Sequence, residues 1–154
     1  MKNGSNQLIK LKNAQRPLVL AIDIGTSSTR ALVYDAVGRQ VKKLSHQIGY
    51  SFTTSGDGGV YADPKFVVDC TAECIDQVMN ELGKDADDIK AVGFDTFWHN
   101  VLGVDRTGKP TTALISWADT RPRSAVEVLK QKLNPEEIHS RTGCVLHPSY
   151  LPAK

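Results

Sequence analysis

The sequence predicts an α/β domain built on a mixed β-sheet with flanking helices, and three observations support this fold class. A nearly continuous apolar run from Leu18 to Ile24 ends at Gly25, as a buried strand does. Only four turn residues separate it from the apolar segment Thr29 to Asp35, so these two strands must be antiparallel. After a helical segment, a further apolar strand is expected from Ile89 to Phe94.

The other elements of this region follow in order along the chain. Gln40 to Tyr50 alternates in polarity as a half-exposed third strand does, which completes an antiparallel meander. Residues 51–62 are rich in glycine and are expected to form a surface loop. Asp63 and Pro64 suit the N-cap and the first position of a helix that Gly83 ends.

Beyond the central strand the expected elements are shorter. Residues 101–104 and 113–117 are predicted to be extended, and helices are expected over residues 122–133 and from Asn134 onward. This order lacks the strict βαβ alternation of a dinucleotide-binding domain. The sequence also contains neither GxGxxG nor a P-loop, so neither dinucleotide nor P-loop chemistry is indicated.

The composition is that of an ordinary globular protein, with 40% hydrophobic and 23% charged residues. The net charge of +2 and the dispersed basic residues do not indicate a nucleic-acid-binding protein. No apolar run approaches the ~20 residues of a membrane span, and three cysteines without a CxxC spacing fit a reducing cytoplasm. We therefore expect a cytoplasmic protein that binds neither nucleic acid nor membrane, while a homo-oligomer remains open. Residues 1–16 are polar and are expected to be a disordered leader before a domain over residues 17–154, and the alternative is a short strand over residues 8–11.

The segment from Asp23 to Arg30, DIGTSSTR, carries the groups that phosphoryl transfer requires. A carboxylate at the end of a buried strand is costly without a partner, and Asp23 can hold a hydrated Mg²⁺ there. Gly25 allows the backbone to approach a ligand closely, and Arg30 adds a fixed positive charge. The N–H groups and hydroxyls that can surround an anion belong to Thr26, Ser27 and Ser28. The alternative is an ordinary hairpin whose hydroxyls only satisfy the turn.

This hairpin motif resembles the first phosphate-binding loop of the actin/Hsp70/sugar-kinase superfamily, and it is most similar to a DxGTxSxR segment of the FGGY carbohydrate kinases. Three further segments resemble that family in the same order, namely Ala91 to Asn100, Ile115 to Arg121 and Arg141 to Pro148. The resemblance runs from about residue 17 to the end of the chain. It implies a ribonuclease H-like (actin-like ATPase) fold, with this chain as an incomplete first domain. It also implies phosphorylation of a sugar or sugar acid with ATP and Mg²⁺.

The resemblance further implies a sugar pocket. Trp98 and His99 stand where members of the family face the substrate hydroxyls, and Trp117 stands where a tryptophan lines the pocket. Each tryptophan also has a plain interpretation as a core or interface aromatic, and His99 as a satisfied loop histidine. Asp119 either caps the following helix or contacts a substrate hydroxyl. The substrate-binding candidates are therefore Trp98, His99, Trp117 and Asp119.

Residues 117–121 and 141–148 most resemble gluconate kinases, which makes gluconate the leading substrate. Trp98 and His99 replace an Arg-Glu pair that is typical of glycerol kinases, and this disfavours glycerol. Xylulose kinases share a histidine near position 99, so a ketopentose remains open, and Leu151 departs from the Pro, Ser or Thr of the family signature. Two further alternatives are a non-catalytic actin/Hsp70-like nucleotide-binding module and a structural α/β domain without a ligand.

The resemblance places the general-base Asp, a second phosphate loop and the adenosine site beyond residue 154. We therefore expect the 154-residue chain alone to show no turnover, because its partner, the remainder of the enzyme, supplies those groups. Uncovered sheet edges and apolar surface are expected to make it pair, swap or aggregate. Assaying the purified chain with ATP and a panel of sugars checks this, and any ATP-dependent phosphorylation would contradict it.

Overall fold

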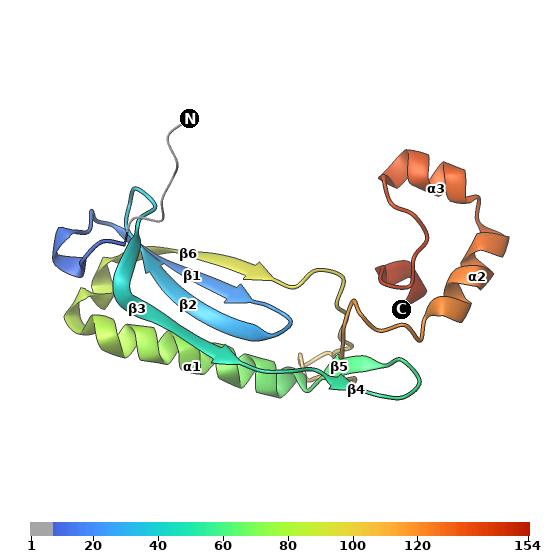
Figure 1. The fold of residues 1–154 in the computed structure, drawn as a ribbon, viewed down its shortest axis with the longest axis horizontal. Coiled ribbons are helices and arrows are strands. Elements are labelled where there is room, and N and C mark those ends of the chain that lie inside the picture. The colour runs from blue at the N-terminus through green and yellow to red at the C-terminus, as the bar shows by residue number, and fades with distance from the viewer. Residues whose placement is uncertain (1–7) are drawn as a thin grey trace. The chain divides into compact units, whose positions relative to one another are not determined.

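The computed structural model describes residues 8–154 and divides this part of the chain into two compact units. The first comprises the residues up to Ser51 together with Val67–Thr96, and the second comprises Phe52–Phe66 and Phe97–Lys154. Each unit contains one β-sheet (Figure 1). Among the described residues, none of the helices is both long enough and apolar enough to cross a membrane.

The sheet of the first unit is mixed and has the strand order β3-β2-β1-β6. β1 (Leu18–Ile24) pairs antiparallel with β2 (Ser28–Tyr34), which pairs antiparallel with β3 (Gln40–Gly49). β6 (Ile89–Thr96) lies parallel to β1 on its other side. The prediction of a mixed sheet that begins with an antiparallel three-strand meander is therefore confirmed.

Helix α1 (Pro64–Leu82) covers one face of this sheet from Val67 onward (Figure 1). The Oδ1 atom of Asp63 accepts a hydrogen bond from the backbone N–H of Lys65 at 2.9 Å, as the predicted N-cap requires. The helix ends at Leu82, just before Gly83, whose φ is +54°, and the 3-10 turn η2 (Gly83–Asp88) leads into β6. One apolar stripe of α1 packs on the sheet, and the resulting core consists of Leu18, Leu20, Ile22, Ala31, Val33, Val41, Leu44, Cys74, Val78 and Leu82.

The sheet of the second unit is small and antiparallel. It contains β4 (Thr53–Thr54), β5 (Val60–Ala62) and β7 (Leu114–Ile115). The prediction that residues 51–62 form only a surface loop is wrong, because the glycines make the turn of a hairpin between β4 and β5. In that turn the N–H of Ser55 donates to the carbonyl of Gly59 at 2.9 Å.

The rest of the second unit consists of a short extended ribbon and three helical segments. The strand predicted over residues 101–104 is reduced to isolated bridges, of Val101 with Ile115 and of Val104 with Pro110. The helical segments are α2 (Arg123–Lys132), α3 (Pro135–Thr142) and the 3-10 turn η3 (Leu151–Ala153). The two predicted helices are thus present, and Asn134 caps α3 by accepting from the N–H groups of Glu136 and Glu137.

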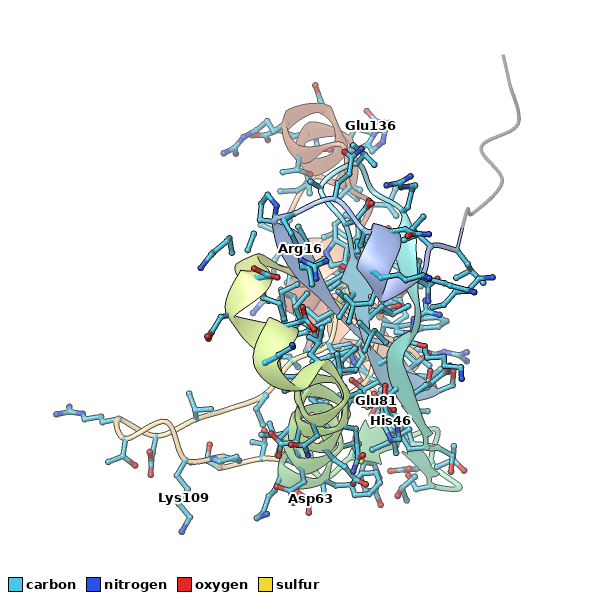
Figure 2. All side chains as sticks on the ribbon, turned by 90° about the vertical axis from the view of Figure 1, so that its left-hand side faces the viewer. Arg16, His46, Asp63, Glu81, Lys109 and Glu136 are labelled. Atoms are coloured by element: carbon cyan, nitrogen blue, oxygen red, sulfur yellow. The ribbon has the colours of Figure 1, made fainter. Side chains whose placement is uncertain are left out.

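Residues 8–16 differ from the disordered leader that their polarity predicted. Ile9 forms a parallel bridge with Val41. The guanidinium of Arg16, which is labelled in Figure 2, pairs with Asp85 and Asp88 at 3.0 and 2.6 Å. A 3-10 turn, η1 (Leu11–Asn13), lies between them. The segment is anchored because three of its residues are apolar and pack against the core, namely Ile9, Leu11 and Ala14. Residues 1–7 of the predicted leader lie outside the described residues.

Asp35 is a buried carboxylate in the turn between β2 and β3. Its oxygens accept hydrogen bonds from the backbone N–H groups of Gln15, Val37 and Arg39. The Arg39 guanidinium adds two more, at 2.9 Å from Nε and 2.6 Å from Nη2. Burial by itself raises the pKa of Asp35, but the hydrogen bonds from Arg39 and the backbone outweigh it and hold that pKa well below its usual range.

Asp35→Asn is expected to lower the free energy of unfolding by about 2 to 3 kcal/mol at neutral pH, since it breaks a buried ion pair. Because the folded-state pKa is depressed, this stabilisation is complete above the unfolded-state pKa of about 4 and is lost as the pH falls below it. The difference between wild type and variant should therefore shrink on acidification. Urea unfolding followed by circular dichroism measures it, with the exposed Asp87→Asn as control. Equal effects of the two substitutions on the free energy of unfolding would contradict the assigned role of Asp35 in stability.

Candidate functional site

The turn between β1 and β2 displays the predicted phosphate-binding residues at one end of the mixed sheet. The N–H of Gly25 donates to the carbonyl of Ser28 at 2.8 Å, which closes the turn. A Cβ atom at Gly25 would lie 3.2 Å from that same carbonyl oxygen, so the close approach favours glycine. Thr26 and Ser27 are exposed, and no hydrogen bond among the described residues uses their backbone N–H groups. Unused, outward N–H groups are what a bound anion requires.

Asp23 and Arg30 face each other across the hairpin. The two residues are register partners of β1 and β2, and Nε and Nη2 of Arg30 lie 2.7 and 2.5 Å from Oδ2 of Asp23. Both side chains are partly exposed, so the pair contributes little to stability. Oδ1 of Asp23 accepts no hydrogen bond from the described residues and is available to a ligand. The predicted metal anchor and the predicted cation are therefore joined in one ion pair.

A magnesium ion fits this end of the sheet only as a hydrated ion. Within residues 8–154, no group of three or more His, Cys, Asp or Glu side chains is placed to hold a metal ion. Asp95 is the register partner of Asp23 on β6, so a second carboxylate adjoins the first. Mg²⁺ keeps several waters and binds through one or two carboxylates together with substrate phosphates. The donors present suit a hydrated Mg²⁺ that arrives with a nucleotide, and they do not form a cage of protein ligands.

Tyr50 holds the phosphate turn from the end of β3, and sequence patterns alone do not single it out. Its hydroxyl donates to the carbonyl of Gly25 at 2.6 Å, and its N–H donates to the carbonyl of Ser27 at 2.8 Å. Desolvation by burial raises the pKa of Tyr50 to about 12, so the phenol remains a donor at physiological pH. Gln47 adds a hydrogen bond from Nε2 to the hydroxyl of Ser28 at 2.9 Å. The turn is thus fixed before any ligand binds.

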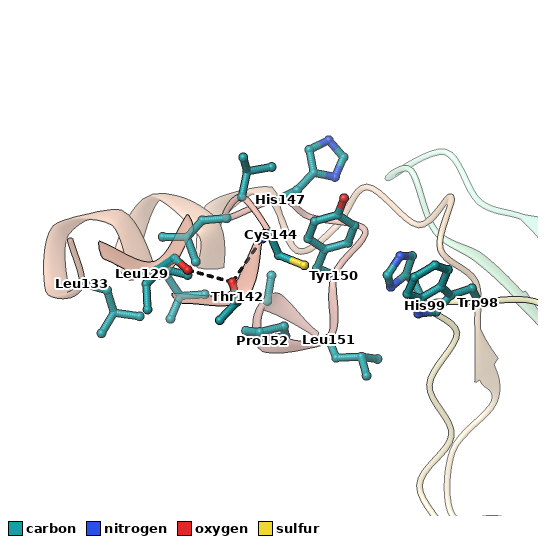
Figure 3. A pocket seen from close by; sticks show the side chains of 14 residues that line it. Trp98, His99, Leu129, Leu133, Thr142, Cys144, His147, Tyr150, Leu151 and Pro152 are labelled. Carbon is teal, nitrogen blue, oxygen red and sulfur yellow. Dashed lines mark hydrogen bonds between the residues drawn. The ribbon is translucent and has the colours of Figure 1, made fainter. Parts of the chain in front are cut away.

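The second unit contains a cavity of about 440 Å³ beside the predicted sugar-binding residues Trp98 and His99 (Figure 3). Its wall is largely apolar where it is formed by α2, α3 and the segment that follows them. Those apolar residues include Leu129, Leu133, Ile138, Val145, Leu146 and Leu151. The aromatic residues among those that line it are Trp98, His99, His147 and Tyr150, each of which carries a polar ring atom or a hydroxyl. A polar ligand is therefore expected at the aromatic end of the cavity rather than along its apolar wall.

Two aromatic rings are stacked at that end, and a third is tilted against them. The ring centroids of Trp98 and His99 lie 4.5 Å apart with an interplanar angle of 18°, and the ring of Tyr150 lies 4.6 Å from that of His99 (Figure 3). We call the stacked rings of Trp98 and His99 the aromatic platform. Trp98 is 79% exposed, so one face of the aromatic platform is open. His99 adopts a left-handed backbone with a φ of +63°, which costs about 1 kcal/mol or more in a residue other than glycine. Strained loop residues of this kind cluster at ligand sites.

Trp117 and Asp119 have different surroundings. Trp117 is 48% exposed, and its N–H donates to Oδ1 of Asn100 at 2.7 Å. Asp119 is 1% exposed and accepts hydrogen bonds from the N–H of Val60 and from Arg121. Burial raises the pKa of Asp119, but the hydrogen bonds from Arg121 and Val60 outweigh it and lower that pKa overall.

The interpretation of Asp119 as a helix cap is wrong, because α2 begins after Pro122 without any side-chain cap. Both carboxylate oxygens of Asp119 are instead used within the protein, where they tie the segment before α2 to β5. The predicted site residues therefore fall into two groups. The phosphate-binding candidates lie in the first unit, and the sugar-binding candidates lie in the second.

Comparison with known proteins gives consistent results. The model for the N-terminal domain of the FGGY family of carbohydrate kinases matches residues 18–154. The gluconokinase of Bacillus subtilis (strain 168) is 31% identical over 130 residues, which cover 84% of this chain and 25% of the relative. A probable glycerol kinase of Caenorhabditis elegans is 36% identical over 141 residues, covering 86% and 28%. The chain thus spans about a quarter of the length of these relatives.

Solved structures of sugar kinases are also similar to this chain. The crystal structure of gluconate kinase from Lactobacillus acidophilus superposes with a TM-score of 0.74 at 28% identity, covering 86% of this chain and 26% of that one. The structure of a ligand-bound xylulose kinase from the same organism has the same TM-score, identity and coverage. The predicted actin-like sugar-kinase fold, with this chain as an incomplete first domain, is therefore confirmed.

Tyr50→Phe is expected to lower the free energy of unfolding by about 1 kcal/mol, because it removes the hydrogen bond to the carbonyl of Gly25. The amide protons of residues 25–28 should also exchange faster, since the turn loses a clamp. Urea unfolding and hydrogen exchange measure the two effects. Tyr34→Phe is the matched control, because no hydrogen bond among the described residues uses the Tyr34 hydroxyl. Unchanged exchange in the turn would contradict the assigned role of Tyr50.

Proposed function

This chain belongs to the FGGY family of carbohydrate kinases, and we propose that the protein it comes from transfers the γ-phosphoryl group of ATP to a hydroxyl of a sugar or sugar acid. Gluconate is the proposed substrate. The chain supplies the first phosphate-binding turn and much of the sugar pocket. The remaining catalytic groups are assigned to the part of the protein beyond residue 154.

The aromatic platform of Trp98 and His99 is the observation that carries this proposal. A nucleotide-binding module of the chaperone or filament class needs the phosphate hairpin but has no use for an exposed aromatic stack beside a cavity. A sugar has both apolar C–H faces and hydroxyls, so it matches an open ring face with hydrogen-bonding groups at the edge. The exposure of Trp98 and the stacking of His99 provide both features.

The phosphate hairpin supplies positioning and charge. When bound, Mg-ATP provides the phosphoryl group and neutralises part of its negative charge. In this proposal Asp23 holds a water of the hydrated Mg²⁺ through Oδ1, while Arg30 orients the same carboxylate through Oδ2. Phosphate oxygens would accept hydrogen bonds from the turn, whose proposed ligand-binding residues are Gly25, Thr26, Ser27 and Ser28.

The sugar is assigned to Trp98, His99 and Trp117. Asp119 was a further candidate, but its buried carboxylate is already occupied by Arg121 and Val60. We therefore assign Asp119 a supporting role, in which it holds the segment that carries Trp117. Hydroxyl contacts would come instead from groups that line the cavity, among them His147 and Tyr150.

Gluconate is proposed from the resemblance of residues 117–121 and 141–148 to gluconate kinases, and a residue that lines the cavity carries a group suited to its oxygens. Nδ1 of His147 accepts a hydrogen bond from the N–H of Ser149 at 3.1 Å, so a neutral ring carries its proton on Nε2. This N–H is a donor suited to a carboxylate or hydroxyl oxygen. The similarity to a gluconokinase and to a gluconate kinase structure supports the same substrate. Similarity to xylulose and glycerol kinases makes a ketopentose and glycerol the comparators to test.

The test is a panel of acceptors assayed with ATP and the complete protein. Gluconate is expected to give the highest kcat/KM, followed by xylulose, and glycerol the lowest. A higher kcat/KM for xylulose or glycerol than for gluconate would overturn the substrate assignment and leave the kinase assignment in place. No phosphorylation of any acceptor would overturn the proposed function itself.

Trp98→Ala and His99→Ala in the complete protein are each expected to raise the KM for the sugar about 10- to 100-fold, because the platform loses a stacking surface or its support. The KM for ATP should change by less than about threefold, since the phosphate hairpin is untouched. Steady-state kinetics with each substrate varied in turn measures both. His139→Ala on the exposed surface of α3 is the control for His99. An unchanged sugar KM would overturn the assignment of the sugar to Trp98 and His99.

A further inference from the structure

We propose that Lys154 is a positioning residue that ties together the two loops of the sugar site. The first substrate loop, residues 98–101, carries Trp98 and His99, and the second substrate loop, residues 115–117, carries Trp117. This inference rests on the proposed function, because it concerns how that site is held in shape. It adds a residue that neither binds the substrate nor takes part in the phosphate hairpin.

The two substrate loops run side by side as a short antiparallel ribbon. Val101 and Ile115 exchange two backbone hydrogen bonds, at 3.0 and 2.9 Å. One step further along, the N–H of Trp117 donates to the side chain of Asn100 at 2.7 Å. Backbone pairing thus ends at Val101 and Ile115, before the aromatic residues that form the site. Beyond that point the loops depend on side chains to stay in register.

Lys154 supplies the next link. Its Nζ atom donates to the carbonyl oxygen of His99 at 3.2 Å and also to the carbonyl oxygen of Ser116. One acceptor belongs to each loop, so a single ammonium group bridges them. Hydrogen bonds from a charged donor are stronger than neutral ones, and an ammonium can satisfy two carbonyls at once. Lys154 therefore adds one more connection between the two substrate loops, and this connection lies at His99 of the aromatic platform.

The position of Lys154 is itself fixed. Its N–H donates to the carbonyl of Leu151 at 3.1 Å at the end of η3, and the preceding Ala153 is buried. Desolvation by burial lowers the pKa of Lys154, while the nearby Asp119 carboxylate opposes this shift. Two of the three N–H donors of the ammonium are used by these carbonyls, so one is left. A structural link is thus the role that its contacts support.

The strained backbone of His99 explains why such a link matters. A left-handed histidine persists only where its surroundings hold it, and here the support comes from its own carbonyl and its ring. The ring stacks on Trp98 and contacts Tyr150, while the carbonyl accepts from Lys154. If the link to Lys154 is removed, His99 can relax toward an ordinary backbone conformation. The platform then loses the orientation that the sugar requires.

The experiment compares three substitutions of Lys154 in the complete protein. Lys154→Met removes the donor and keeps the bulk of the stem, Lys154→Gln reaches at most one carbonyl, and Lys154→Arg retains enough donors for both. Lys132→Met, on the exposed face at the end of α2, is the matched control. We expect Met and Gln to raise the sugar KM about 10- to 100-fold and Arg and the control to change it less than about threefold. The KM for ATP should stay within about threefold in all four.

A second measurement does not depend on catalysis. Amide hydrogen exchange should quicken in peptides covering residues 97–102 and 113–118 of Lys154→Met and Lys154→Gln, because Val101, Ile115 and Trp117 donate across the two loops. A peptide covering residues 18–34 of the first unit should be unaffected. If Lys154→Met does not fold, the KM values and the hydrogen exchange are compared between Lys154→Gln and Lys154→Arg instead.

The two proposals fail in different ways. Unchanged exchange in both loops, or equal increases in the KM values for sugar and ATP, would overturn the role of Lys154. An unchanged sugar KM in Lys154→Gln and Lys154→Met would do the same. If the wild-type protein phosphorylates no acceptor, the proposed kinase function fails, and hydrogen exchange still decides whether Lys154 ties the two loops together.

Discussion

Burial of strand β1 is the constraint on which the rest of the first unit depends. Leu18, Leu20 and Ile22 point into the core against α1, and each such side chain contributes roughly 1.5 to 3 kcal/mol when fully buried. Because side chains alternate along a strand, Asp23 must then lie on the other face. Pairing of β1 with β2 places Arg30 opposite Asp23. The geometry of the phosphate hairpin is thus a consequence of the core beneath it.

The second unit is organised differently, because polar links rather than a large apolar core hold the loops that carry its proposed sugar-binding residues. Its sheet has only short strands, and the Asp119 carboxylate and the Lys154 ammonium make the connections between distant segments. Such links are directional, so they fix the position of a loop more narrowly than apolar packing does. A sugar kinase needs this precision, because a small misplacement of the acceptor hydroxyl costs much of the rate.

How far the sequence predicts the structure depends on the range of the interactions. Local signals are strong at β1 and α1, where an apolar run and an Asp-Pro start define the elements, and both predictions are confirmed. The roles of Tyr50, Asp119 and Lys154 rest on contacts with residues 25, 59 and 55 positions away, which no local pattern encodes. The same limit explains residues 8–16, whose apolar side chains find partners only in the folded core. The predicted contacts of the phosphate-binding and sugar-binding residues with their ligands remain predictions.

We expect the β1–β2 hairpin to bind the phosphates of a magnesium nucleotide through Asp23. Titration calorimetry of the complete protein with Mg-ATP, in the wild type and in Asp23→Asn, tests it most directly. We expect measurable binding by the wild type and an affinity at least about tenfold weaker in the variant, which corresponds to about 1.4 kcal/mol. The loss of affinity for ATP in the variant should be larger with Mg²⁺ than without it, because the carboxylate acts through the hydrated ion. Equal affinities of the two proteins for Mg-ATP would contradict the proposed role of Asp23 in nucleotide binding.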